Sequence, residues 1–404
     1  SLRTQGLLKA NMKIGITNNQ YPEQRNILVN PDNEYINLKK SNLFYFINPL
    51  RTRLLKKNKT FVFQPVPFSG ASRADILHLF NEVAITPQKW VASFETELPR
   101  VLPVAGVAKQ DNPELKRLIP YLLKDNCLGL IAISDATLNI QMKLFRPDIA
   151  QQIRRKTLVL HPPQKLFIQQ KAPRQPGILK LTFAGNEFYR KGGAEVVLAI
   201  SELIEERKLE ESQLDVQLIG DLAKRRNVAH RQFQDDETFY SGIENRIKRY
   251  RCFTHHSQMD NGALMQLFRQ SDAGLLPTWQ ETYGFSVLEM QANGCPVITS
   301  NVRALPEINP ASAGWVIASP LNADREYSIT SPEQKTQLRQ SLVEGLKSIL
   351  LAIIDRPEML QEKGEAAILR IKDQHDTQRY IARLNDIYSR GVINVTQHPP
   401  VVSI

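Results

Sequence analysis

The sequence predicts an α/β protein built from two doubly wound domains, each with a parallel β-sheet. Short apolar runs typical of buried strands alternate with helical segments along most of the chain. The 404 residues are too many for one compact core. The alternation also stops at a polar segment with two prolines, Gln169–Pro176, and then restarts. We therefore expect two domains, with ligands bound beyond the carboxyl ends of the strands.

The first half of the chain begins with the apolar run Met12–Thr17, which predicts a first parallel strand. The polar loop after it contains no G-x-G-x-x-G pattern, so the dinucleotide fingerprint is absent. Further strands are predicted at Leu43–Ile47, Phe61–Gln64, Asp75–Phe80, Trp90–Phe94, Leu128–Ser134 and Thr157–Leu160. Ser134 is a suitable N-cap for a helix that starts near Asp135.

The second half repeats this pattern. Strands are predicted at Leu179–Ala184, Val216–Gly220, Arg251–Thr254, Ala273–Leu276, Cys295–Thr299 and Gly314–Ala318. A helix is expected from about Ala194 to Lys208, and helices from Pro332 to about Arg390. The tail from Val392 to Ile404 is predicted to be irregular.

The positive charge of the chain is concentrated in its first half. The net charge is +11, and residues 1–170 contain 24 Lys and Arg against 12 Asp and Glu. A basic, leucine-containing stretch, Arg51–Lys59, is consistent either with a helix at a membrane interface or with a solvated surface. The asymmetry suggests an anionic partner, such as a phospholipid surface, a phosphorylated or lipid-linked acceptor, or nucleic acid. A basic surface without any partner is the alternative.

We expect the chain to carry no signal for export or for membrane insertion. It contains no apolar run as long as a membrane span, and its start lacks the apolar core of a signal peptide. The cysteines Cys127, Cys252 and Cys295 are far apart in sequence and form no C-x-x-C pair. These features predict a cytoplasmic protein without disulfides, with peripheral contact to an anionic inner membrane face as a hypothesis.

The segment from Leu275 to Ile308 contains the most informative pattern. A buried strand ends at Pro277, a polar loop follows, and Tyr283-Gly284-Phe285 opens an amphipathic helix. The backbone N–H groups at such a helix start favour phosphate. Two carboxylates, Glu281 and Glu289, bracket this turn. Acidic groups beside an anion-binding turn suit a ligand that has hydroxyls as well as phosphates, such as a nucleotide sugar.

The segment Glu281–Glu289 resembles the E-x7-E motif of family 4 retaining glycosyltransferases, the glycosyl transferases group 1. The preceding LLPT and the following NGCPVITSNVRALPEI match the same family. The resemblance is strong over about residues 178–320 and weaker before them. It implies the GT-B fold, in which two Rossmann-like domains face a cleft.

The resemblance also implies that the two domains bind different substrates. Residues 1–170 would form the N-terminal, acceptor-side domain. Residues 171–374 would form the C-terminal domain that binds the nucleotide sugar. The last helices, from about residue 375 to 404, would pack back on the N-terminal domain.

In the family the second acid binds the ribose, so the resemblance assigns this role to Glu289. Glu281 would contact hydroxyls of the donor sugar and support positive character at its anomeric carbon. The backbone amides of the helix start would bind the distal phosphate and nearby sugar oxygens. These amides belong to Tyr283, Gly284, Phe285 and Ser286.

The segment Gly185–Gly192 resembles the family's G-R-x-x-x-x-K-G loop, which binds the diphosphate. Gly185 and Lys191 match the pattern, whereas Asn186 stands where the family usually has Arg. Arg190 is a candidate to supply the missing charge. A second departure is Glu95, which occupies the place of a His that lies near the donor sugar in many members. Glu95 could contact the sugar or the acceptor, or it could lie on the rim near Arg100.

The family's mechanism uses no metal ion, since the departing phosphate can accept the acceptor's proton on the same face. The sequence lacks a D-x-D triplet and a His/Cys ligand cluster, so no metal and no cofactor are predicted beyond the donor substrate. His255 and His256 are candidates for the base pocket. His78 is expected to be a core or rim histidine.

The predicted function is thus hexosyl transfer, with retention, from a nucleoside-diphosphate sugar to a glycan or lipid acceptor. It would serve glycan or glycolipid biosynthesis. One alternative is a catalytically impaired GT-B protein that only binds a sugar nucleotide or a glycan, which Asn186 and Glu95 leave open. The other is a basic nucleic-acid-binding protein, for which the sequence offers no stacking or basic motif.

Overall fold

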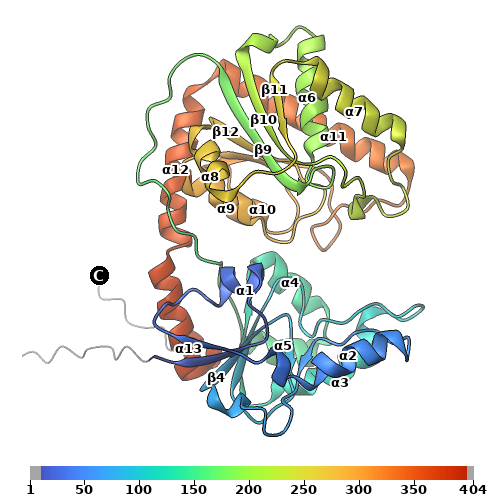
Figure 1. The fold of residues 1–404 in the computed structure, drawn as a ribbon, viewed down its shortest axis with the longest axis vertical. Helices are drawn as coiled ribbons and strands as arrows, with labels where there is room; N and C mark the ends of the chain where they lie inside the picture. The colour runs from blue at the N-terminus through green and yellow to red at the C-terminus, as the bar shows by residue number, and fades with distance from the viewer. Residues whose placement is uncertain (1–10, 398–404) are drawn as a thin grey trace, which may run out of the picture. The chain divides into compact units, whose positions relative to one another are not determined.

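The computed structural model describes residues 11–397, which divide into two compact units (Figure 1). The first unit contains residues 11–163 and 377–397, and the second contains residues 164–376. Each unit is built on a six-stranded sheet in which all described strand pairings are parallel. The predicted α/β fold class with two parallel-sheet domains is therefore confirmed.

The sheet of the first unit has the strand order β2-β1-β4-β6-β7-β8. Its strands are β1 (Lys13–Ile16), β2 (Glu34–Asn37), β4 (Ile76–Phe80), β6 (Trp90–Phe94), β7 (Cys127–Ala132) and β8 (Thr157–Val159). A separate parallel pair consists of β3 (Val62–Phe63) and β5 (Val83–Ala84). The helices are α1 (Tyr21–Asn26), α2 (Leu43–Arg53), α3 (Pro113–Leu123), α4 (Asp135–Lys143), α5 (Pro147–Arg155) and α13 (Thr377–Gln397).

The two faces of this sheet pack against different cores, as the alternation of side chains along a strand requires. In β4, Leu77 belongs to one core cluster and Ile76 to the other, which α13 completes. His78 points to the α13 side and is fully buried. Its ring nitrogens lie 2.7 Å from the Tyr388 hydroxyl and 2.8 Å from the Ser93 hydroxyl. Burial lowers the pKa of His78 to about 3, so this core histidine is neutral.

The sheet of the second unit has the order β11-β10-β9-β12-β13-β14. Its strands are β9 (Leu179–Glu187), β10 (Leu214–Asp221), β11 (Phe253–His256), β12 (Ala273–Leu276), β13 (Val297–Ser300) and β14 (Gly314–Ile317). The helices are α6 (Gly193–Glu205), α7 (Glu237–Arg249), α8 (Asn261–Gln270), α9 (Phe285–Ala292), α10 (Leu305–Ile308), α11 (Pro332–Asp355) and α12 (Glu358–Gln374). No helix within residues 11–397 has both the length and the apolar character needed to cross a membrane.

Two local predictions are wrong. Leu43–Ile47 is not a strand but the first part of α2, because the Asn42 side chain accepts a hydrogen bond from Phe44 N and caps a helix there. The apolar run alone did not distinguish the two structures. The tail is also not irregular from Val392, because α13 continues to Gln397 across a break at Gly391.

The proline-containing segment Gln169–Pro176, predicted as a linker, packs on the second unit. Lys171 donates to the Gly294 carbonyl at 2.6 Å, and Arg174 pairs with Asp272 at 2.9 Å. The chain passes from one unit to the other after Pro163. The prediction of Ser134 as an N-cap is confirmed, since its side chain accepts from Thr137 N at 3.0 Å.

Candidate functional site

The strand order of the second unit reverses at β9, which lies between β10 and β12. Chain connections leave β9 and β12 in opposite directions at such a point, so the loops after the two strands frame a crevice. These loops are the segments 188–192 and 277–284. The structure therefore brings together, at the carboxyl edge of one sheet, the two motifs that the sequence singled out.

Hydrogen bonds join the two loops. Arg190 O accepts from Trp279 N at 3.0 Å and from the Thr278 hydroxyl at 3.2 Å. The Thr278 hydroxyl also reaches Gln280 O at 2.8 Å. Because the Thr278 carbonyl accepts from Ser300 at 2.7 Å, the second loop is fixed to the end of β13 as well. The two loops are thus held in one arrangement by several hydrogen bonds.

An ion pair between Lys191 and Glu281 spans these loops. Their side chains are 18% and 13% exposed, so each group can still reach a ligand. The other Glu281 oxygen accepts from Thr282 N at 3.2 Å. Gly185 leaves room for Lys191, because a Cβ at this position would lie 2.6 Å from the lysine's Cβ. A cation and a carboxylate thus lie together at the place where the family resemblance implies that the diphosphate and the sugar bind.

Arg190, the candidate to supply the missing charge, already pairs with groups of the protein. Its guanidinium pairs with Glu187 and donates to Gln280 O at 2.9 Å. The hydrogen bond from Arg190, together with its charge, lowers the pKa of Glu187. Asn186, which stands in place of the family's Arg, is exposed. In this structure Arg190 therefore fastens the two loops to each other.

The start of α9 forms one side of the site. Gly284 precedes the helix with φ +105°, and a Cβ there would lie 2.7 Å from Leu305 Cδ2. Within the helix only Phe285, Ser286 and Glu289 are not buried. Positions three and four residues apart share one face of a helix, so Glu289 lies on the side of α9 that its first turn exposes. Tyr283 itself is buried, 5.0 Å from the Phe285 ring.

A buried polar cluster lies beneath the loop that carries Glu281. Arg339 of α11 pairs with the fully buried Glu195 at 2.9 Å and with Asp235 at 2.6 Å. The His230 ring packs edge-on against Trp279, with 4.4 Å between the ring centroids. Burial lowers the pKa of His230 to about 3, so this ring is neutral. This cluster was not predicted from the sequence, because its members are spread over more than a hundred residues.

His255 and His256 lie at the end of β11. His255 Nε2 is 2.8 Å from Gly220 O, and the ring packs at 6.3 Å from Phe188 in the loop after β9. His256 Nε2 is 3.3 Å from the Gln217 side chain. The structure thus places His255 next to the Lys191 loop, and a role in base binding stays a prediction for both histidines.

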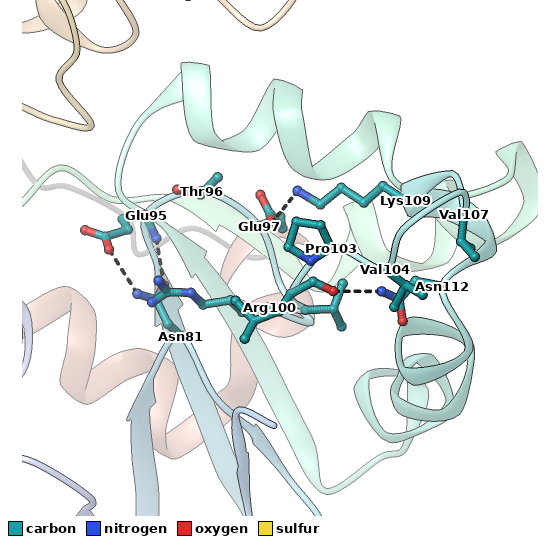
Figure 2. A pocket seen from close by; sticks show the side chains of 12 residues that line it. Asn81, Glu95, Thr96, Glu97, Arg100, Pro103, Val104, Val107, Lys109 and Asn112 are labelled. Carbon is teal, nitrogen blue, oxygen red and sulfur yellow. Dashed lines mark hydrogen bonds and ion pairs between the residues drawn. The ribbon is translucent and has the colours of Figure 1, made fainter. Parts of the chain in front are cut away.

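Glu95 lines a pocket of about 340 Å³ in the first unit (Figure 2). Glu95 and Asn81 exchange two hydrogen bonds, both of 3.1 Å, between the ends of β6 and β4. In the same pocket Glu97 pairs with Lys109 at 2.5 Å. Arg100 lies over the Phe61 ring at 4.6 Å. The hydrogen bonds with Asn81 thus orient the Glu95 carboxylate.

A larger pocket of about 530 Å³ lies where the strand order of the first unit reverses, between β1 and β4. Its lining includes Thr17 after β1, Glu82 after β4, and the cations Lys39, Arg53 and Lys59. The Thr17 hydroxyl donates to Glu82 at 2.5 Å. Burial raises the pKa of Glu82 to about 7. This second crevice was not predicted from the sequence.

Residues 164–348 match the family model "Glycosyl transferases group 1". The curated relatives include a glycogen synthase from two strains of Mycobacterium tuberculosis. Each is 25% identical over 161 residues, which are 40% of this chain and 34% of the relative. The chain thus spans about a third of the length of these relatives.

Several solved structures have the same architecture. A glycosyltransferase from Rickettsia africae matches with a TM-score of 0.54 and 14% identity, over 93% of this chain and 89% of its own. Anabaena HepE in complex with UDP and glucose matches with a TM-score of 0.57 and 12% identity, over 94% and 99%. Sucrose-phosphate synthase from Thermosynechococcus elongatus matches at 0.52 and 15%, over 89% and 81%. The fold is therefore GT-B.

Proposed function

We propose that the protein is a glycosyltransferase that uses a nucleoside-diphosphate sugar as donor and transfers the sugar with retention. The Lys191–Glu281 pair at the reversal of strand order carries the proposal. A cation suits the diphosphate, a carboxylate suits sugar hydroxyls, and the start of α9 offers amides to the distal phosphate. The group 1 match over residues 164–348 supports the same reading.

The proposal gives the pair two states. Without donor, Lys191 and Glu281 neutralise each other across the two loops. When the donor binds, Lys191 turns to the diphosphate and stabilises the charge that develops on the leaving group. Glu281 is then released to accept hydrogen bonds from the sugar and to support positive charge at the anomeric carbon.

The remaining candidates have supporting roles in this proposal. Glu289 lies one helical turn after the start of α9, and its carboxylate accepts hydrogen bonds from the ribose hydroxyls. Gly185 and Asn186 border the diphosphate, and Arg190 fixes the two loops to each other rather than binding it. The amides that bind phosphate and sugar oxygens are those of Tyr283, Gly284, Phe285 and Ser286.

The chemical step proposed is that of the metal-independent, family 4 type of transfer. The bond between the anomeric carbon and the phosphate oxygen breaks as the acceptor oxygen attacks on the same face. The departing phosphate accepts the acceptor's proton, so no side chain has to act as the base. The pocket around Glu95 is proposed to hold hydroxyls of the acceptor.

The acceptor is proposed to be a glycan or lipid with an anionic group. The pocket between β1 and β4 supports this, because Lys39, Arg53 and Lys59 border it. Side-chain amides from Asn42 and Asn48 add to the polar lining. Three cations around one crevice favour a phosphate or carboxylate on the acceptor.

The first test is a thermal-shift panel of nucleoside diphosphates and their sugars, since a ligand that binds only the folded protein raises its Tm. The second is release of sugar from the stabilising donor, followed by NMR of the product's anomeric configuration. We expect release that disappears in Glu281→Gln. Donor binding without any sugar release would instead favour the binding-only alternative, and an inverted product would overturn the retaining mechanism.

A further inference from the structure

The outer side of α2 and the turn after it exposes a row of large apolar side chains. Phe46, Leu50 and Leu54 follow one another at four-residue intervals and are 58%, 52% and 72% exposed. Residues spaced in this way share one side of a helix. Leu55 adds a further exposed apolar side chain beside the end of the row. A helix that only covered a core would turn these side chains inward.

The remaining sides of α2 already have neighbours. Tyr45, Asn48 and Thr52 line the pocket between β1 and β4. Phe44 is partly buried and packs against a core cluster. The Asn48 side chain donates to Thr60 O at 3.0 Å and accepts from Thr60 N at 3.0 Å, which fixes the helix to the following segment. The orientation that exposes the apolar row is thus set by contacts on the other sides.

The charged residues of the segment that carries this row are all basic. Residues 35–74 contain eight Lys and Arg and no Asp or Glu. Arg53, Lys56, Lys57 and Lys59, which follow or end the helix, are all exposed. A basic cluster beside an exposed apolar row fits an anionic lipid surface, where the cations meet headgroups and the apolar side chains enter the acyl boundary.

We propose that α2 and the turn after it, residues 43–59, dock this protein onto an anionic lipid bilayer. The helix lies in the plane of the interface, with Phe46, Leu50 and Leu54 inserted and the basic side chains on phosphate headgroups. This mode requires no membrane-crossing helix. The inference does not depend on the proposed activity, because it concerns binding of the protein itself.

The bilayer accounts for the surface better than two other partners. A nucleic acid would use the cations and the aromatic Phe46, but it gains nothing from exposed Leu50, Leu54 and Leu55. A second copy of this chain would bring the same basic cluster against itself, and like charges oppose such contact. Both remain distinguishable outcomes of the experiment.

The experiment is flotation of the full chain with vesicles of equal parts phosphatidylglycerol and phosphatidylcholine, at physiological salt. Vesicles of phosphatidylcholine alone provide the neutral comparison. We expect the protein to float with the anionic vesicles and to bind the neutral ones at least about ten-fold more weakly. Equal binding to both, or to neither, would overturn the proposal.

Two pairs of variants separate the charge from the apolar row. Lys56→Gln with Lys57→Gln, and Phe46→Gln with Leu50→Gln, should each weaken anionic-vesicle binding by about ten-fold or more. Their matched controls are Lys248→Gln with Arg269→Gln, and Ile178→Gln with Leu369→Gln, on exposed sites of the second unit. The controls should bind vesicles like the unchanged protein.

Folding and partner choice are checked in the same samples. All substituted side chains are exposed, so the Tm of each variant should stay near that of the unchanged protein. If the Phe46/Leu50 variant floats normally but sediments at a lower mass, the row joins two copies and the proposal is wrong. If it floats normally and binds single-stranded RNA more weakly, the surface serves nucleic acid and the proposal is equally wrong.

Discussion

Lys191 and Glu281 form an ion pair between the loops that follow two adjacent strands, β9 and β12. The residues are 90 positions apart in the chain. Each side chain compensates the charge of the other until a ligand competes for one of them. Substitutions of the two residues should therefore have different effects on binding of the nucleoside diphosphate.

Lys191→Met should weaken binding of the matching nucleoside diphosphate by about 10- to 100-fold, the cost of losing a hydrogen bond to a charged group. Glu281→Gln removes the competing partner of Lys191, so the same diphosphate should bind as tightly as before or more tightly. Turnover in Glu281→Gln should fall by about 100- to 1,000-fold. Calorimetric titration and sugar release measure the two effects. Equal weakening of diphosphate binding in both variants would contradict the exchange of partners.

Gly192→Ala should destabilise the protein by about 2–4 kcal/mol. Gly192 has φ +89°, and a Cβ there would lie 2.2 Å from Pro277 O in the neighbouring loop. Urea unfolding gives the change in free energy. The matched control is Gly242→Ala within α7, where a Cβ meets nothing within 4 Å. This control should gain about 0.5–1 kcal/mol. Similar effects at both positions would rule out close approach of the loops as the cause.

Arg339→Met should cost about 3–5 kcal/mol of stability, because it leaves the fully buried Glu195 without its cation, whereas Asp235 keeps Lys335 at 2.8 Å. The loop of Trp279 packs on this cluster, so donor affinity should also fall. The control is Arg356→Met, which removes an exposed pair with Glu358 and should leave stability close to that of the unchanged protein. Unfolding curves of the two variants measure both changes in stability. A small loss in Arg339→Met would mean that water replaces the missing partner.

Glu82→Gln should stabilise the protein increasingly as the pH rises. Burial raises the pKa of Glu82 from 4.5 to about 7, so the folded state holds this proton more tightly than the unfolded chain does. Between these pH values the folded form of the unchanged protein loses stability as the pH rises, and above about pH 7 the loss is complete. The variant lacks this loss, so its advantage should be near zero at pH 4 and about 1–3 kcal/mol at pH 8. Urea unfolding at both pH values measures it. A difference that does not change with pH would show that Glu82 keeps its ordinary pKa.

Much of the fold was predictable because local sequence patterns specify the strands and the helix starts. The strands Trp90–Phe94 and Ala273–Leu276 were predicted with the bounds that the structure has. Their apolar runs are short, lie between breakers and need burial on both sides of a sheet. The start of α9 after Gly284 follows in the same way, because only glycine adopts its φ without strain. Such signals need no knowledge of distant residues.

Apolar pattern and residue type were insufficient where a hydrogen-bonding partner chooses between alternatives. The run beginning at Leu43 suits a strand or a helix, and Asn42 decides for the helix while its side chain also bonds Val62 O at 2.9 Å. Arg190 stays a candidate for the diphosphate, and the structure adds that Glu187 and the Gln280 carbonyl engage it. In both cases the hydrogen-bonding partner, rather than residue type, sets the conformation.

The sequence by itself determined the two α/β domains, most strands, and the residue types that suit a nucleotide sugar. Only the tertiary structure decided that Lys191 faces Glu281, that Glu195 is buried against Arg339, and that Phe46 and Leu50 remain outside. The physical reason is that periodicity fixes which side of an element is apolar, over a few residues. Which element covers that side, and which charge meets which, depends on contacts between segments far apart in the chain.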